Sequence, residues 1–210
     1  MSEKTALLLG SSGLVGAELL TMCLQSDLYK KVITPVRTPL PIHHEKREER
    51  IINFEMPPWE DLFPVDHVYC CLGTTIKKAG SKSNFIKVDH DFPLAFAGAA
   101  KKWKSSVYSI ITATGVSAES KIFYNRVKGE LQLNLKAMEL QGTLIFQPSF
   151  LLGDRNEFRL IEKRWSTNFA KYIYILSINC FVFICINHRT GGTCTNKKFQ
   201  FFSPNVCNIF

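Results

Sequence analysis

Gly10-Ser11-Ser12-Gly13-Leu14-Val15-Gly16 is the stretch that decides the fold of this chain. It directly follows the apolar run Thr5–Leu9 and opens the helical pattern Leu14–Leu24. A glycine-rich turn between a strand and a helix lets the backbone approach a pyrophosphate, whose charge the helix N-terminus stabilises. Glycines cluster in many tight turns, so the prediction depends on this strand–turn–helix context. The stretch predicts a dinucleotide-binding turn in which Gly10–Gly16 hold the cofactor.

The first 150 residues alternate short apolar runs with helical patterns, which is typical of βαβ units around a parallel sheet. We expect strands at Thr5–Leu9, Lys31–Val36, Ile51–Phe54, His67–Leu72, Ser106–Thr112 and Thr143–Phe146. We expect helices at Leu14–Leu24, Phe85–Trp103 and Ser120–Leu140, with a bend or late start at Pro93 and a loop over Thr38–Arg50. Strands that are apolar almost throughout are covered by helices on both faces. The fold class is therefore α/β, a doubly wound Rossmann-type parallel sheet with helices on both faces.

The length of 210 residues, with 46% hydrophobic and 21% charged residues, suits one ordinary globular domain. A net charge of +8 is at first sight a nucleic-acid signal. The excess lies mainly in residues 157–210, which carry seven Lys/Arg and two Asp/Glu, and no acid follows Glu162. Lys197-Lys198 has no nucleic-acid module around it. The charge distribution therefore argues against a nucleic-acid partner.

Targeting and membrane signals are weak in this sequence. The apolar run Ala6–Leu9 is too short for a signal peptide, so we expect a cytoplasmic protein. The apolar stretch Tyr172–Ile186 falls short of the roughly 20 residues of a membrane helix, so we expect no integral membrane segment. The seven cysteines form no Cys-x-x-Cys pair, and we expect no metal site. Cys70-Cys71 lies in an apolar run, where buried free thiols are the expected state.

The end of the second strand indicates which dinucleotide binds. NAD-binding folds usually place an acid there for the ribose 2′-hydroxyl, whereas an arginine suits a 2′-phosphate. The strand ends Thr34-Pro35-Val36-Arg37, and no acid follows until Glu45. Arg37 is able to form a bidentate pair with a phosphate, the alternative being a solvated side chain. We therefore expect NADP(H) in preference to NAD(H).

Tyr124-Asn-Arg-Val-Lys128 carries the candidate chemistry. Residues at i and i+4 share one helical face, so the phenol and the ammonium can point into the same cleft. A nearby cation stabilises a tyrosinate, which makes Tyr124 a candidate general acid or base, and Lys128 is also placed to hold the nicotinamide ribose. Thr112 and Thr114 end the preceding strand, and either hydroxyl can bond a substrate carbonyl oxygen. We favour Thr112 because it lies twelve residues before Tyr124.

Further motifs make the chain resemble the atypical short-chain dehydrogenase/reductases, and within them the HIV Tat-interacting-protein oxidoreductase group with its bacterial relatives. Besides Gly10–Gly16 and Tyr124–Glu130, the resemblance rests on Cys70–Thr75, Lys78–Gly80, Val88–Asp91 and Pro148–Arg155. It implies that Leu72, Gly73 and Thr74 line the cofactor and that the segment Gln147–Ser149, with Pro148 and Ser149 as binding residues, flanks the nicotinamide end. It also places Tyr124 and Lys128 at the cofactor and the usual small hydroxyl residue, commonly Ser, at Thr112.

The resemblance ends after Glu162. We therefore divide the chain into an NAD(P)-binding Rossmann domain, residues 1–162, and a divergent, basic, Cys- and Asn-rich tail, residues 163–210. Family members pack a C-terminal segment over the substrate side, whereas this tail reads like translation out of frame or a divergent ending. We expect it to be poorly ordered or loosely collapsed on the domain.

Two functions remain open from the sequence. The first is an NADP(H)-dependent oxidoreductase that transfers hydride to or from a small carbonyl or alcohol substrate. The second is a non-catalytic NADP(H)-sensing regulatory protein that binds a protein partner. The fold alone does not decide between these two functions. A homo-oligomer is compatible with either.

Overall fold

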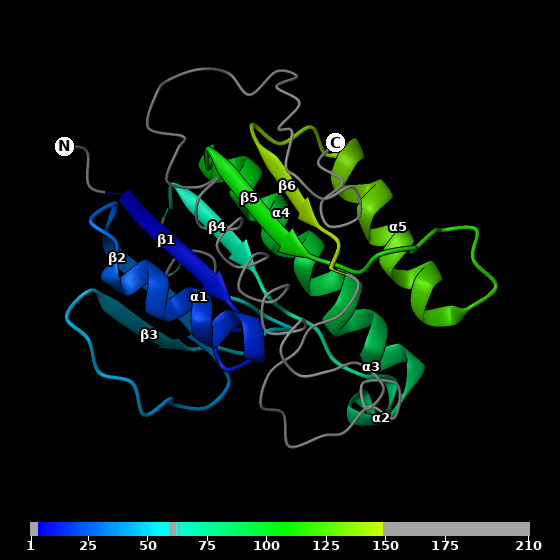
Figure 1. Ribbon diagram of the computed structural model, residues 1–210, viewed down its shortest axis with the longest axis horizontal. Coiled ribbons are helices and arrows are strands. Elements are labelled where there is room, and N and C mark those ends of the chain that lie inside the picture. The colour runs from blue at the N-terminus through cyan, green and yellow to red at the C-terminus, as the bar shows by residue number, and fades with distance from the viewer. Residues whose placement is uncertain (1–3, 59–61, 63, 149–210) are drawn as a thin grey trace, which may run out of the picture.

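The computed structural model describes residues 4–58, 62 and 64–148 (Figure 1). Six parallel strands form one sheet in the order β3-β2-β1-β4-β5-β6. They are β1 (Lys4–Leu9), β2 (Tyr29–Val36), β3 (Arg47–Ile51), β4 (His67–Cys70), β5 (Val107–Ile111) and β6 (Thr143–Phe146). The chain reverses its direction across the sheet between β1 and β4, and doubly wound folds bind ligands at this point, beyond the carboxyl ends of the strands. The predicted fold class is confirmed.

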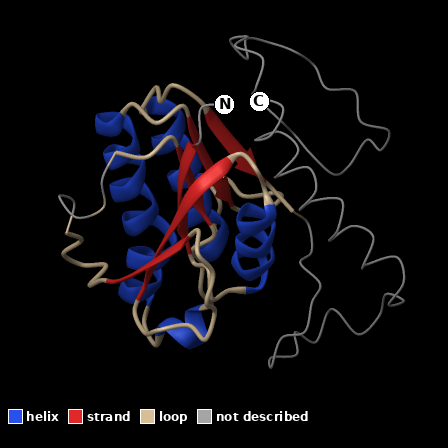
Figure 2. Ribbon diagram, turned by 90° about the vertical axis from the view of Figure 1, so that its left-hand side faces the viewer, coloured by secondary structure: helices blue, strands red, loops and turns tan. Residues whose placement is uncertain are grey.

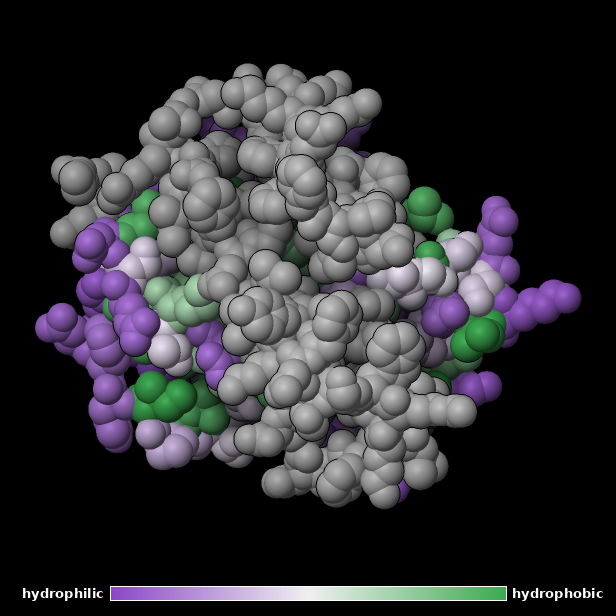
Figure 3. All heavy atoms as spheres, viewed as in Figure 1, coloured by the Kyte–Doolittle hydropathy of each residue, from purple (hydrophilic) through white to green (hydrophobic). Residues whose placement is uncertain are grey.

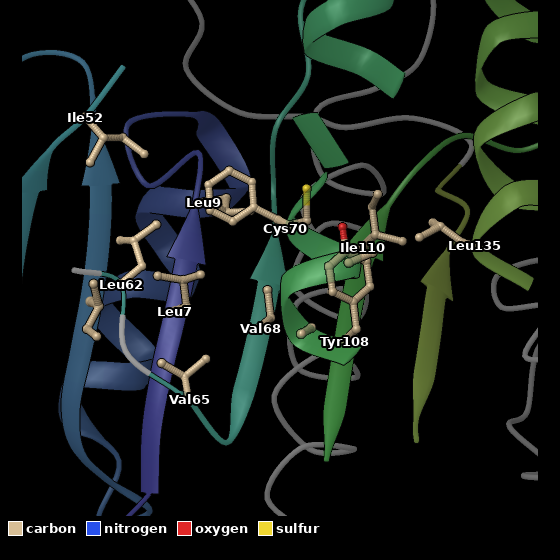
Figure 4. Packing of buried hydrophobic residues seen from close by; sticks show 14 of the residues in the cluster. Leu7, Leu9, Ile52, Leu62, Val65, Val68, Cys70, Tyr108, Ile110 and Leu135 are labelled. Carbon is tan, nitrogen blue, oxygen red and sulfur yellow. The ribbon is translucent and has the colours of Figure 1, made fainter. Parts of the chain in front are cut away.

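Helices cover the two faces of the sheet (Figure 2). They are α1 (Leu14–Gln25), α2 (Ile76–Ala79), α3 (Lys82–Ile86), the π-helical turn η1 (Lys87–Asp91), α4 (Phe92–Trp103) and α5 (Phe123–Ala137). Alternate residues of a strand face opposite sides, so Ala6 and Leu8 pack with α1, whereas Leu7 and Leu9 pack in the core with α4 and α5. Figure 4 shows this second core from Leu7 to Leu135. These two cores hold in place the end of the sheet where the strands have their carboxyl ends, which is called the carboxyl edge below.

The third strand lies earlier than predicted. We expected a loop over Thr38–Arg50 and a strand at Ile51–Phe54, but β3 runs from Arg47 to Ile51. At the edge of the sheet the first four residues of β3 are half-buried and Ile51 is exposed, so this strand needs no apolar run. Glu48 instead pairs with Lys31 at 2.6 Å and accepts a 2.7 Å hydrogen bond from Arg50. Figure 3 shows hydrophilic residues gathered along the left margin of the molecule, the side on which β2 and β3 lie in Figure 1.

The helix expected over Phe85–Trp103 is divided in three. α3 ends at Ile86, η1 follows, and α4 begins at Phe92. Pro93 lies in the first turn of α4, directly after the π-helical turn, so a carbonyl of that turn lacks the hydrogen bond that the missing N–H of Pro93 would have donated. The backbone stays helical from α3 through η1 into α4, so the helical run over Phe85–Trp103 is confirmed. The expected late start at Pro93 is wrong, because the irregularity is the π-helical turn that comes just before it.

The other predicted helices are found with different ends. α5 is shorter at both ends than the expected Ser120–Leu140, and the short α2 was not expected. Within the described part of the chain, no helix has the length and apolar character needed to cross a membrane. The expected boundary at residue 162 and the tail after it lie outside the described residues.

Candidate functional site

The glycine turn packs directly against the segment that follows β4. Gly10 has a positive φ of 75°, and a Cβ added there would lie 2.5 Å from the carbonyl oxygen of Cys71. A Cβ added at Gly16 would lie 2.0 Å from the carbonyl oxygen of Gly10. Side chains at these two positions would therefore push apart β1, α1 and the segment after β4. Both glycines are required by the close approach of backbone to backbone.

Ser11 gives a test of whether this turn fits a cofactor. Its side chain is 1% exposed, and its Oγ has no hydrogen-bond partner among the described residues. A buried hydroxyl without a partner costs about 1–3 kcal/mol, which a bound acceptor or donor would offset. α1 begins directly after Gly13, and no side chain of Gly13 caps it, so the N-terminus of the helix carries backbone N–H groups and the positive end of the helix dipole. The residues of the turn therefore fit a dinucleotide pyrophosphate.

A buried ion pair lies on the other side of the same edge. Lys128 Nζ on α5 lies 2.8 Å from Asp89 Oδ1 in η1, and the two side chains are 5% and 1% exposed. The second oxygen of Asp89, Oδ2, accepts a 2.8 Å hydrogen bond from the backbone N–H of Thr74. Burial raises the pKa of the Asp89 carboxyl above its ordinary value, against the opposing effects of Lys128 and the Thr74 N–H. The carboxylate thus joins α5 to the segment after β4.

Leu72, Gly73 and Thr74 occupy that segment, as the resemblance implies. A Cβ added at Gly73 would lie 3.7 Å from Asp89 Oδ1, so the exposed Gly73 borders the ion pair. Contacts therefore run without a break from Gly10, through residues 71–74 and Asp89, to Lys128. In Figure 1, α2 and α3 lie beyond the carboxyl ends of β4 and β5, on this side of the sheet.

Tyr124 lies one turn before Lys128 on α5 and is half-buried. Its ring packs against that of Phe85, with 5.7 Å between the ring centroids. The phenol has no hydrogen-bond partner among the residues that the structure describes. α3 therefore holds the Tyr124 ring through Phe85, while η1 holds Lys128 through Asp89.

Thr112 follows β5 and is buried, with 6% of its side chain exposed. Its Oγ1 donates to the carbonyl oxygen of Phe146 at 3.3 Å and accepts a 2.8 Å hydrogen bond from Gln132 Nε2. Gln132 Oε1 in turn accepts a 2.7 Å hydrogen bond from Gln147 Nε2. Thr114 is exposed, and its hydroxyl donates to the carbonyl oxygen of Gln147. Both candidate hydroxyls are thus held by the end of β6.

Arg37 follows the end of β2 with an exposed side chain that has no ion-pair partner in the described part of the chain. The neighbouring acid Glu49 is engaged elsewhere, because it accepts from Leu40 N at 2.9 Å and pairs with Arg47. The Leu40 N–H, followed by Arg47, holds the pKa of Glu49 below its ordinary value. The end of β2 therefore presents an exposed arginine, and Glu49 on β3 is already paired with Arg47.

At the predicted nicotinamide end, the structure places Pro148 after β6, where its carbonyl oxygen accepts a 3.2 Å hydrogen bond from Thr114 N. Ser149 lies outside the described residues. The prediction of buried free thiols holds for Cys70, which is unpaired and 0% exposed, and burial raises its pKa to about 11. Cys71 is also unpaired but only half-buried as a residue.

Sequence reasoning assigned no role to Asp89 or Gln132. Asp89 was noted only as part of the Val88–Asp91 motif. A signal was present, because Asp89 lies four residues after Phe85 and seven before Phe96, in a helical pattern whose apolar positions are buried. A carboxylate on an otherwise apolar face indicates a buried charge with a partner.

Comparison with known proteins places the chain among characterised sequences, although no family model matches it. Protein FMP52, mitochondrial, of Eremothecium gossypii is 38% identical over 152 residues, which cover 71% of this chain and 67% of that protein. Protein FMP52-2, mitochondrial, of Scheffersomyces stipitis is 32% identical, covering 80% and 76%. Protein HTATIP2 of Rattus norvegicus is 32% identical, covering 76% and 67%.

Solved structures with the same fold include two nucleotide-sugar epimerases. UDP-glucose 4-epimerase of Thermotoga maritima aligns with a TM-score of 0.59 at 13% identity, over 73% of this chain and 58% of that one. ADP-L-glycero-D-manno-heptose-6-epimerase of Helicobacter pylori aligns with a TM-score of 0.61 at 13% identity, over 87% and 63%. This chain thus spans less than two thirds of these proteins, and the likeness shows the Rossmann-type fold.

The comparisons correct one expectation from the sequence. We expected a cytoplasmic protein because the N-terminal apolar run is short. Relatives from Eremothecium gossypii, Candida glabrata, Emericella nidulans and Debaryomyces hansenii are all named mitochondrial proteins, so that expectation is wrong. The length of an apolar run tests for a secretory signal, and it carries no information on import into an organelle.

Proposed function

Since this chain belongs to the family of HTATIP2 and the FMP52 proteins, within the atypical short-chain dehydrogenase/reductases, we propose that it is an NADP(H)-dependent oxidoreductase of small carbonyl or alcohol compounds. The observation that carries the proposal is the continuous set of contacts from the glycine turn, through residues 71–74 and Asp89, to Lys128. These contacts connect the N-terminus of α1, which suits an anion, with the buried ammonium of Lys128, near the point where the strand order of the sheet reverses.

The cofactor would be held by residues that follow several strands at the carboxyl edge of the sheet. Gly10–Gly16 and the N-terminus of α1 bind the pyrophosphate, and the free Arg37 binds the 2′-phosphate. Leu72, Gly73 and Thr74 line the middle of the site, and Pro148 with Ser149 flanks the nicotinamide end. When bound, the nicotinamide supplies the hydride or accepts it.

Tyr124 and Lys128 would then handle the proton. Lys128 has three N–H donors, and one of them is used by Asp89. Another would donate to a ribose hydroxyl of the cofactor, and the positive charge would act on Tyr124 through space. An ammonium near the phenol stabilises the tyrosinate form, which lets Tyr124 pass its proton to a substrate oxygen and recover it. Phe85 keeps the phenol ring in place for this transfer.

Thr112 would orient the substrate oxygen. A hydroxyl has one proton, which Thr112 donates to Phe146 over a long 3.3 Å. Because Gln132 donates into the same oxygen at 2.8 Å, the hydroxyl can turn its proton to a substrate carbonyl without losing all of its bonds. Thr114 remains the alternative for this role.

The proposal is tested by following NADPH oxidation by the purified full chain across a panel of small aldehydes and ketones, with Tyr124→Phe as the matched control. Steady oxidation that the control loses supports the oxidoreductase. Binding of NADPH with no turnover across the panel contradicts it and favours the regulatory protein that senses NADP(H).

We further propose a mitochondrial location, on the strength of the names of the fungal relatives. Fractionation of cells that express the full chain with a C-terminal epitope tag tests it. The tagged chain is expected in the mitochondrial fraction, and recovery in the cytosol alone would contradict this location.

A further inference from the structure

The ammonium of Lys128 sits in a place where it needs a fixed counter-charge. Its side chain is 5% exposed, and a buried charge without a partner costs several kcal/mol. Lysine also has a flexible four-carbon stem, so its head takes a defined position only when something holds it. The partner within reach is Asp89 at 2.8 Å, itself 1% exposed.

The two oxygens of Asp89 bind two different segments. Oδ1 pairs with Lys128 on α5, and Oδ2 accepts from the backbone N–H of Thr74 after β4. Both segments belong to the proposed cofactor site. A single carboxylate therefore sets the position of the ammonium relative to the backbone that lines the cofactor.

The backbone around Asp89 is irregular where this contact is made. Asp89 is the middle residue of η1, the π-helical turn inserted between α3 and α4. A π-helical turn adds a residue to the helix and changes the direction of the side chains that follow, and such turns are frequent at functional sites. Here the turn places the Asp89 carboxylate against the segment that follows β4, while Phe85 before the turn and Phe96 after it stay buried in the core.

We propose that Asp89 is a positioning residue, which holds the Lys128 ammonium against the cofactor segment Leu72–Thr74 and so sets the affinity for the nicotinamide cofactor. The inference rests on the proposed function, because it assigns Asp89 a task at that site. Asp89 touches neither cofactor nor substrate in this role and acts only through Lys128. Removal of the Asp89 charge should therefore weaken cofactor binding only when Lys128 is present.

The test is a double-mutant cycle on the full chain: wild type, Asp89→Asn, Lys128→Met and the double variant. An asparagine still accepts from Thr74 N but carries no charge. NADPH affinity is measured by fluorescence titration, and unfolding by urea denaturation is followed on the same proteins. Asp91→Asn is the matched control, since Asp91 lies in the same turn but its side chain is 52% exposed and pairs with His90.

Asp89→Asn is expected to weaken NADPH binding about tenfold with Lys128 present, as for the loss of a charge-assisted contact. In the Lys128→Met background the same change should leave affinity equal or improve it, and Asp91→Asn should bind as wild type. Unchanged affinity in Asp89→Asn, or an equal loss in both backgrounds, would overturn the inference alone. If Asp89→Asn does not fold, the comparison of Lys128→Met with the double variant decides: weaker binding by the double variant overturns it. A wild-type chain that binds no NADPH would contradict the proposed function, and this inference with it.

Discussion

Gln132 Nε2 donates a 2.8 Å hydrogen bond to Thr112 Oγ1 in the buried space between α5 and the end of β5. The threonine hydroxyl is thereby oriented by the same helix that carries Tyr124 and Lys128. Gln147 Nε2 extends the chain of hydrogen bonds by donating to Gln132 Oε1 at 2.7 Å. In the proposed oxidoreductase, this network prepares one hydroxyl for a substrate oxygen and keeps its acceptor side occupied.

Replacement of Thr112 by valine is expected to lower kcat about 10²-fold, as the loss of one preorganised donor to a substrate oxygen does in other enzymes. Thr112→Ser keeps the hydroxyl and should retain most of the activity. Thr114→Val serves as the control and should behave as wild type in the same kinetic assay. If Thr114→Val loses the activity and Thr112→Val keeps it, the roles of the two threonines are reversed.

Tyr124→Phe is expected to lower kcat by about 10²–10⁴-fold, which is the usual contribution of a general acid or base. NADPH affinity should change little, because the phenol is not a main anchor of the cofactor. The Phe85 contact is kept by the phenylalanine ring, so the fold should also be unchanged. Steady-state kinetics with a carbonyl substrate checks the prediction, and undiminished turnover would remove Tyr124 from the mechanism.

Two glycines of the turn should respond differently to alanine. A methyl group at Gly16 would lie 2.0 Å from the Gly10 carbonyl oxygen, so Gly16→Ala should lower the free energy of unfolding by several kcal/mol or prevent folding. Gly13 has an ordinary φ of −82° and a nearest contact of 3.3 Å to the same oxygen. Gly13→Ala should fold, but it narrows the approach to the α1 N-terminus and should weaken NADPH binding. Urea denaturation and cofactor titration of both variants separate the two effects; equal stability of the two would show that the Gly16 contact relaxes freely.

The doubly wound parallel sheet could be predicted from the sequence, because buried parallel strands are nearly all apolar and the glycine turn indicates the first βαβ unit. β3 was misplaced because an edge strand with Glu48 and Arg50 carries charges where a central strand carries apolar residues. Asp89 was not given a role because its partner, Lys128, is far along the chain. A tertiary ion pair leaves no local pattern, and only the carboxylate on an apolar face indicated it.

Arg37→Ala is expected to remove most of the preference for NADPH over NADH. A charge-assisted contact to the 2′-phosphate contributes about 1.5–3 kcal/mol, or roughly tenfold to a hundredfold in affinity. Glu49 should not take over as a ribose ligand, because Leu40 N and Arg47 already engage its carboxylate. The change is expected in NADPH affinity, with NADH affinity nearly constant. An Arg37→Ala chain that keeps the wild-type ratio would show that another group reads the 2′-phosphate.

Calorimetric titration of the purified full chain with NADPH, and separately with NADH, tests the central claim most directly. The account predicts saturable binding of NADPH at one site per chain, with NADH binding at the same site more weakly. Prior saturation with NADPH should abolish the heat of NADH binding, because both use the glycine turn. Absence of saturable binding by either dinucleotide would contradict the assignment of Gly10–Gly16 and Lys128 to a cofactor site.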